Sequence, residues 1–88
     1  MNVITLIGRV ASFKGNEVTI SVNRNYKDEY GVYMNDLIPI CLDINMTEQM
    51  TRYCKIGDVI GVKGRLENRD GVIVMAEKVS FLASKKAE

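Results

Sequence analysis

The chain has 88 residues, of which 47% are hydrophobic and 26% are charged, and its net charge is +1. This length fits one domain with a small core, and no apolar run is long enough for a membrane span or a signal peptide. Proteins that bind nucleic acid mainly by charge are usually more basic. Binding of that kind must therefore depend on local groups of basic and aromatic residues, or on assembly of several copies.

Metal and catalytic chemistry are disfavoured by the residue types present. The chain has no histidine, and its two cysteines, Cys41 and Cys54, do not form a CxxC motif. A zinc site and a histidine general base are therefore not expected, and we interpret the cysteines as reduced, mostly buried thiols of a cytosolic protein. We expect no enzymatic activity, no cofactor, no metal and no small-molecule substrate.

Residues 2–12 are predicted to form a strand that is apolar on both faces. Ile4 and Leu6 share one face, whereas Val3 and Ile7 share the other. One face fits the core, and the other needs a second partner, for which another copy of the chain is the simplest choice. The residues expected at this interface between copies are Val3, Thr5, Ile7 and Arg9.

The middle of the chain contains two further strands around a polar segment. Residues 17–24 alternate between apolar and polar side chains, which predicts a strand paired with the first one. Residues 25–35 break this alternation and form either a polar loop or a protruding hairpin. A third strand is predicted at 36–44, where Pro39 indicates an edge or a bulge.

A short helix is predicted over residues 46–54, because Asn45 and Glu48 have the spacing of a capping box. Two more strands follow, at 58–68 and 72–82, joined by a tight Asp-Gly turn.

Three strands, a short helix and two strands are the element order of the OB-fold, an all-β, five-stranded Greek-key barrel with a helix between strands three and four. Gly61 and Gly64 fit this prediction, because a glycine inside a strand indicates a bend or a close approach of another backbone. We expect the barrel domain to span residues 1–83 and a short disordered tail to occupy 84–88.

Five segments also match a known family in order and spacing. They are residues 1–10 (Met-Asn-Val-Ile-Thr-Leu-Ile-Gly-Arg-Val), 22–24 (Val-Asn-Arg), 36–40 (Asp-Leu-Ile-Pro-Ile), 53–66 (Tyr-x-x-x-Gly-Asp-x-x-x-Val-x-Gly-Arg-Leu) and 79–82 (Val-Ser-Phe-Leu). Together they resemble the bacterial single-stranded DNA-binding protein family. The resemblance implies sequence-nonspecific binding of single-stranded DNA in replication, recombination or repair, within the cytoplasm at the nucleoid. It also implies a homo-oligomer, dimer or tetramer, paired through the first strand, with replication or recombination proteins as further partners.

The chain departs from the family pattern at several places. The family's third strand carries aromatic residues that stack on bases, and the matching positions here are Leu37 and Asp43. The hairpin between strands four and five is short, and the sequence ends in Lys-Lys-Ala-Glu instead of the family's acidic-hydrophobic tip. We interpret the chain as a minimal member of phage or mobile-element type.

The candidate site combines stacking surfaces with cations. Tyr26 matches a stacking position of the family and is flanked by Arg24 and Lys27, a mixture that suits a flexible strand. Tyr30 and Tyr33 either add stacking surfaces or pack against the barrel or a neighbouring subunit. The full set expected at nucleic acid is Arg24, Tyr26, Lys27, Tyr30, Tyr33, Leu37, Lys63, Arg65 and Arg69.

Two other functions fit the same features. The near-zero net charge and the missing aromatics suit an accessory protein of primosome or helicase-loading type that mainly contacts other proteins. An RNA-binding OB module is the second alternative, because stacking alone does not distinguish ribose from deoxyribose.

Overall fold

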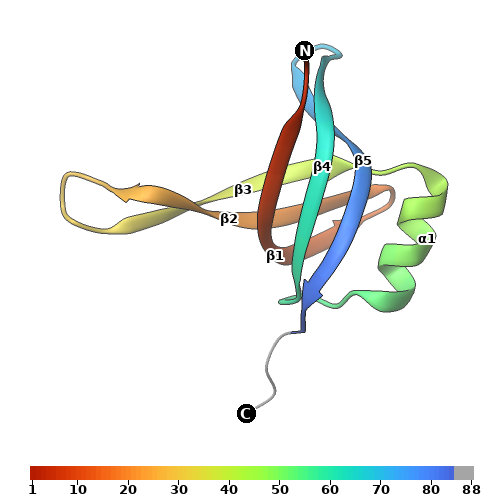
Figure 1. Ribbon diagram of the computed structural model, residues 1–88, viewed down its shortest axis with the longest axis horizontal. Coiled ribbons are helices and arrows are strands. Elements are labelled where there is room, and N and C mark those ends of the chain that lie inside the picture. Colours follow the sequence, from red (N-terminus) through yellow and green to blue (C-terminus); the bar gives the residue numbers. More distant parts are fainter. Residues whose placement is uncertain (85–88) are drawn as a thin grey trace.

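Five strands and one helix follow one another in the predicted order (Figure 1). The computed structural model describes residues 1–84, so the predicted tail lies outside the described residues except for Ser84. The elements are β1 (Ile4–Lys14), β2 (Glu17–Lys27), β3 (Tyr33–Cys41), α1 (Ile44–Tyr53), β4 (Val59–Asn68) and β5 (Val72–Ala83). The strands close into a barrel in the order β1-β2-β3-β5-β4, which confirms the predicted OB-fold.

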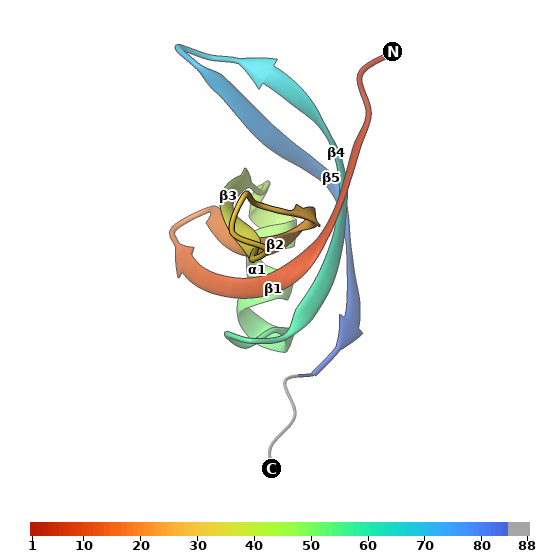
Figure 2. The ribbon, with the colours of Figure 1, turned by 90° about the vertical axis from the view of Figure 1, so that its left-hand side faces the viewer.

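Each strand uses only part of its length to close the barrel. The first half of β1, from Ile4 to Arg9, pairs with β4, and the second half pairs with β2. Closure between β3 and β5 is parallel and involves only two residue pairs. The remaining lengths of β2 and β3 project as a hairpin, and the β4–β5 hairpin leaves the barrel elsewhere (Figures 1 and 2). Residues 25–35 therefore form a protruding hairpin and not a loop. Pro39 precedes the two closing pairs, where β3 has only β2 beside it, as expected for an edge position.

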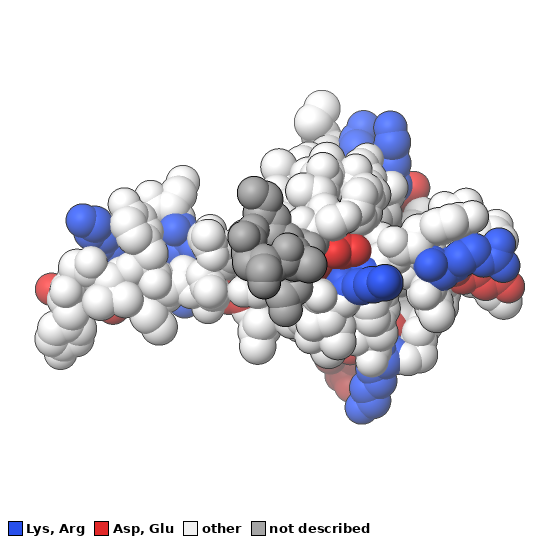
Figure 3. Space-filling model, turned by 90° about the horizontal axis from the view of Figure 1, so that it is seen from below, with Lys and Arg blue, Asp and Glu red and all other residues white. Residues whose placement is uncertain are grey.

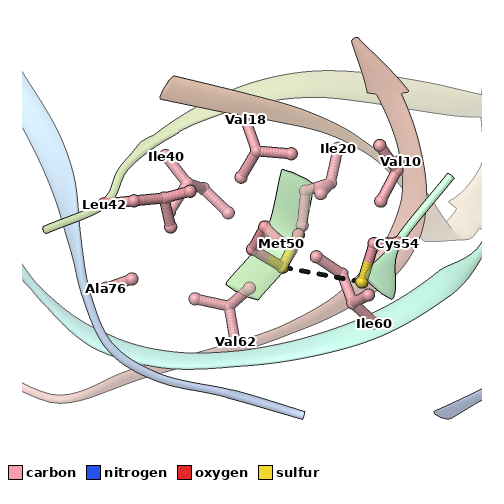
Figure 4. Packing of buried hydrophobic residues seen from close by; sticks show 10 residues of the cluster. All are labelled: Val10, Val18, Ile20, Ile40, Leu42, Met50, Cys54, Ile60, Val62 and Ala76. Atoms are coloured by element: carbon pink, nitrogen blue, oxygen red, sulfur yellow. Dashed lines mark hydrogen bonds between the residues drawn. The ribbon is translucent and has the colours of Figure 1, made fainter. Parts of the chain in front are cut away.

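The barrel interior is filled by aliphatic side chains from every strand, and α1 closes one end (Figure 4). Met50 is the buried residue of α1, and its Sδ lies 3.7 Å from the Sγ of Cys54. Burial, with a smaller contribution from the Asp58 carboxylate, raises the pKa of Cys54. The buried set is Val10, Val18, Ile20, Ile40, Leu42, Met50, Cys54, Ile60, Val62 and Ala76.

The two glycines of β4 differ in their surroundings. A Cβ on Gly64 would lie 2.1 Å from the carbonyl oxygen of Met75, beside a bulge in the β4–β5 ladder. A Cβ on Gly61 would make ordinary contacts, with the Leu82 side chain at 3.5 Å and with the Ile7 side chain and the Leu6 carbonyl oxygen at 4.0 Å. The close approach predicted from the two glycines is therefore confirmed at Gly64 alone.

The third strand ends, and the helix begins, earlier than predicted. Asp43 is the N-cap, and its Oδ1 accepts a 2.7 Å hydrogen bond from the backbone N–H of Met46. The predicted capping box at Asn45 and Glu48 is wrong, because Asn45 already lies within the first turn of α1. Asp43 matches a stacking position of the family. In this structure its carboxylate instead caps the N-terminus of α1.

Phe81 also differs from expectation. We expected this side chain in the core, but it is half exposed and lines a groove between β5 and α1 together with Tyr53. Within residues 1–84, no helix is both long and apolar enough to cross a bilayer.

Replacing Gly64 tests the close approach of β4 to β5. Gly64→Ala places a methyl group against backbone and should lower the free energy of unfolding by about 1–3 kcal/mol. Gly61→Ala is the matched control on the same strand and should change it by less than about 1 kcal/mol. Urea unfolding measures both, and equal effects would contradict the assigned contact.

Replacing the helix cap tests which residue begins α1. Asp43→Ala removes the acceptor for the Met46 N–H and should lower the free energy of unfolding by about 1 kcal/mol. Asn45→Ala should leave the stability within about 0.5 kcal/mol of the unmodified protein. Urea unfolding measures both variants. If Asn45→Ala lowers the free energy of unfolding more than Asp43→Ala does, the capping box at Asn45 and Glu48 would be correct after all.

Candidate nucleic-acid interface

The projecting part of the β2–β3 hairpin, residues 24–36, is called the arm below (Figure 1). Its tip is a turn organised by Asp28. The Oδ1 of this residue accepts hydrogen bonds from the backbone N–H groups of Tyr30 and Val32, both at 2.9 Å. The backbone N–H of Asp28 also donates to the carbonyl of Val32, and Gly31 has the positive φ of 79° that the turn needs.

Three tyrosines are presented to solvent along the arm. Tyr26 and Tyr33 are each 59% exposed, and Tyr30 near the tip is 81% exposed. Val32 and Met34 are also exposed on the arm. An aromatic ring on a projecting hairpin buries little area in the folded chain, so core packing does not account for these residues. Of the alternatives for Tyr30 and Tyr33, packing against their own barrel is not observed, which leaves stacking surfaces or contact with a neighbouring subunit.

Arg24 is held by Asp36 across the arm. The Arg24 Nε lies 3.1 Å from one carboxylate oxygen of Asp36, and the Arg24 NH2 lies 2.9 Å from the other. These two bonds lower the pKa of Asp36 and raise the pKa of Arg24. The nearby Tyr26 makes a smaller contribution to the raised pKa of Arg24. Both groups are charged at neutral pH, so the Arg24 charge is compensated by a carboxylate.

Lys27 and Tyr33 lie opposite each other in the arm, with the Lys27 Nζ 5.6 Å from the centre of the Tyr33 ring. This distance is within the range of a cation–π contact. The ammonium group stays available to solvent, because no ion pair to Lys27 forms among residues 1–84.

Leu37 lies at the base of the arm and points outward. It pairs with Ser21 in the β2–β3 ladder and is exposed, whereas its neighbour Ile38 packs against the core. Strand alternation places Leu37 on the same face of β3 as Asn35 and Tyr33, opposite the face of Asp36. Tyr33 and Leu37 therefore share one face, whereas the opposite face carries the Arg24–Asp36 pair.

The predicted cations of β4 do not join the arm. Arg65 and Arg69 lie on the β4–β5 hairpin, and both donate to Glu67, at 2.7–2.8 Å. Arg65 also donates to Glu77 at 3.1 Å. The bonds from Arg65, followed by the charge of Arg69, lower the pKa of Glu67. Three of the five predicted phosphate contacts, Arg24, Arg65 and Arg69, are thus bound to carboxylates.

Lys63 belongs to another surface, the outer face of β1, β4 and β5. There it lies beside Thr5 and Lys78, its cross-strand partners, in a shallow hollow that also includes Ile7 and Leu82. Charges on the face seen in Figure 3 form separated groups and not a continuous basic band.

The first half of β1 has an unpaired edge. Pairing with β2 begins only at Arg9, so from Ile4 to Gly8 no strand of the described chain is hydrogen-bonded to that side. Val3 and Ile7 are exposed on the outer face, as predicted from the two-faced apolar pattern. Arg9 donates a 2.8 Å hydrogen bond to the carbonyl of Gly57, so this side chain helps to hold the turn after α1.

Sequence reasoning missed the carboxylates that bind the arginines and the role of Asp28. Arg24 and Asp36 are twelve residues apart, and only the register of the hairpin brings them together. Asp28 had a local signal, an aspartate followed by a Gly-containing tyrosine segment, which is typical of an Asx turn. No group of three or more metal-binding side chains comes together within residues 1–84.

Comparison with known proteins gives consistent matches over nearly the whole chain. Single-stranded DNA-binding protein 1 of Clostridium acetobutylicum is 36% identical over 107 aligned positions, which cover 98% of this chain and 97% of the relative. Single-stranded DNA-binding protein B of Bacillus subtilis is 33% identical over 81% of this chain and 72% of its own length.

Among solved structures, the Plasmodium falciparum SSB in complex with single-stranded DNA superposes with a TM-score of 0.71. The sequence identity is 20%, and the alignment covers 93% of this chain and 95% of that one. No family model matches the sequence.

Proposed function

This chain belongs to the family of single-stranded DNA-binding proteins, and we propose that it binds single-stranded DNA through the arm, without sequence preference and without catalysis. The observation that supports this most directly is the projection of three exposed tyrosines on one hairpin. Every base has an aromatic face, so stacking on Tyr26, Tyr30 and Tyr33 accepts any sequence. The binding domain that we propose is the barrel over residues 1–83.

Stacking and charge make unequal contributions in this proposal. Base stacking on an aromatic side chain contributes about 1–3 kcal/mol per base. Lys27 is the cation of the arm best placed to meet phosphates, because it is not ion-paired within the described chain. Lys63 is also without an ion pair there, but it lies beside Thr5 and Ile7, so it can contact only DNA that continues from the arm onto the outer face of β1 and β4. Arg24, Arg65 and Arg69 remain secondary contacts, since each must leave a carboxylate to bind phosphate. Leu37 offers an apolar contact for a base at the foot of the arm.

We propose that the protein acts as a homo-oligomer built through β1. The unpaired edge at Ile4–Gly8 can add a strand from a second copy, and Val3, Thr5 and Ile7 present a self-complementary outer surface beside it. Arg9 lies at the rim of this surface. Two or more arms in one assembly would share a single strand, so weak individual sites combine into tight binding.

Single-stranded DNA arises during replication, recombination and repair, and these are the processes that we propose for the protein. In a bacterial cell they take place in the cytoplasm, at the nucleoid. Proteins of replication or recombination are the further partners that this setting offers.

Removing one ring from the arm tests the stacking role. Tyr26→Ala should weaken binding of dye-labelled oligo-dT by about 5- to 100-fold, because one stacked base loses its platform. Tyr53→Ala, an exposed tyrosine on α1, should bind like the unmodified protein. Fluorescence anisotropy at low and near-physiological salt measures both, with a duplex of the same length as reference. Unchanged binding by the Tyr26 variant would remove the stacking role, and equal binding of duplex would indicate generic electrostatics.

Placing a charge on the outer face of β1 tests the interface. Ile7→Lys should shift the protein toward monomer, because it adds an ammonium group to an apolar contact that already lies beside Lys63 and Lys78. Ile56→Lys is the matched control, since Ile7 and Ile56 are 59% and 60% exposed. Sedimentation velocity over a range of concentrations measures the oligomeric state. A monomeric unmodified protein, or an Ile7 variant that assembles normally, would contradict the proposed interface.

A further inference from the structure

The arginines of both projecting hairpins are bound to carboxylates of the same hairpin. On the arm, Asp36 takes both a 2.9 Å and a 3.1 Å bond from Arg24. On the β4–β5 hairpin, the two oxygens of Glu67 accept from Arg65 and Arg69. The two sites lie on different parts of the barrel, so the same arrangement occurs twice independently (Figure 1).

Fold stability is a weak explanation for the Arg24–Asp36 pair, whose side chains are 39% and 46% exposed. Glu67 is less exposed, at 24%, and joins a network with Arg65 and Arg69, so a stabilising role is least expected for the pair on the arm. Exposed ion pairs contribute little to stability, because solvent screens them and two long side chains lose freedom. What the pairs do change is the net charge presented next to Tyr26 and at the tip of the β4–β5 hairpin.

The two forms of DNA respond differently to such a surface. A duplex keeps its bases stacked inside and offers mainly phosphates, which bind by releasing counterions to free cations. A single strand also offers base faces to Tyr26 and its neighbours. A guanidinium that is already bound by a carboxylate contributes little to binding of duplex phosphates. Stacking of bases on the tyrosines does not depend on that guanidinium.

We infer that Asp36 is a specificity-determining residue, which holds Arg24 in an ion pair so that the arm selects single strands over duplex. Glu67 has the same role on the β4–β5 hairpin. The selectivity arises because binding of duplex DNA is weakened, and not because a contact to single-stranded DNA is added. This inference rests on the proposed binding of single-stranded DNA by the arm.

The test removes one negative charge and keeps the side-chain shape. Asp36→Asn frees Arg24 and should raise duplex affinity at low salt by about two- to five-fold, the range within which an exposed ion pair competes. Oligo-dT affinity should rise less, so the ratio of single-strand to duplex affinity falls at least two-fold. The salt dependence of duplex binding should steepen by roughly one phosphate contact. Glu67→Gln should change the ratio in the same direction.

The matched control is Glu48→Gln on the exposed side of α1, where the carboxylate has no ion pair within the described chain. It alters the net charge equally and should leave the ratio unchanged. Anisotropy with labelled oligo-dT and competition by unlabelled duplex give both affinities, and circular dichroism verifies folding of each variant.

Three outcomes would overturn the inference while the proposed function stands. They are an unchanged ratio in the Asp36 variant, an equal shift in the Glu48 control, or a loss of oligo-dT binding, which would mean that Asp36 positions Arg24 for DNA. An unmodified protein that does not bind oligo-dT would instead overturn the proposed function, and this inference with it.

Discussion

The structure depends on closure of the barrel through only two residue pairs between β3 and β5. Closure over so short a length is compatible with long strands only if each strand divides its length between two neighbours. Gly64 lies where β4 comes close to β5, since a Cβ there would be 2.1 Å from the Met75 carbonyl oxygen. The strand lengths left over become the arm, the β4–β5 hairpin and the unpaired edge of β1. All surfaces assigned to binding or assembly are therefore by-products of one geometric requirement.

Charge on these projections is arranged to cancel locally. The chain has twelve basic and eleven acidic residues, and the arginines of both hairpins meet carboxylates of the same hairpin. The aromatic side chains of the arm are not covered in a comparable way, since its tyrosines remain exposed. A surface of this kind distinguishes ligands by the availability of flat apolar faces more than by charge density. The low net charge, which first argued against nucleic-acid binding, is consistent with a single-strand binder of this type.

The barrel could be predicted from the sequence because strand alternation and element order are local. Val18 and Ile20 are fully buried, as their alternation predicts. The helix start was not predictable with the same accuracy, because Asp43 and Asn45 are both good capping residues and only the folded backbone selects between them. The state of Arg24 could not be predicted, because it depends on hairpin register, which brings together residues that the sequence separates by twelve positions. Arg65 and Arg69 each lie two residues from Glu67, so their pairing had a local signal in the sequence.

The turn at Asp28 affects how tightly the arm can bind a ligand. Two backbone N–H groups at the tip are bound by one carboxylate in the folded chain, so the tip is ordered before any strand arrives. A disordered loop would lose conformational freedom at the moment of binding and would weaken the complex accordingly. Here that entropy is lost during folding instead. The arm thus behaves as a preorganised element, and Tyr30 is presented from a fixed base and not from a loop that must find its conformation on contact.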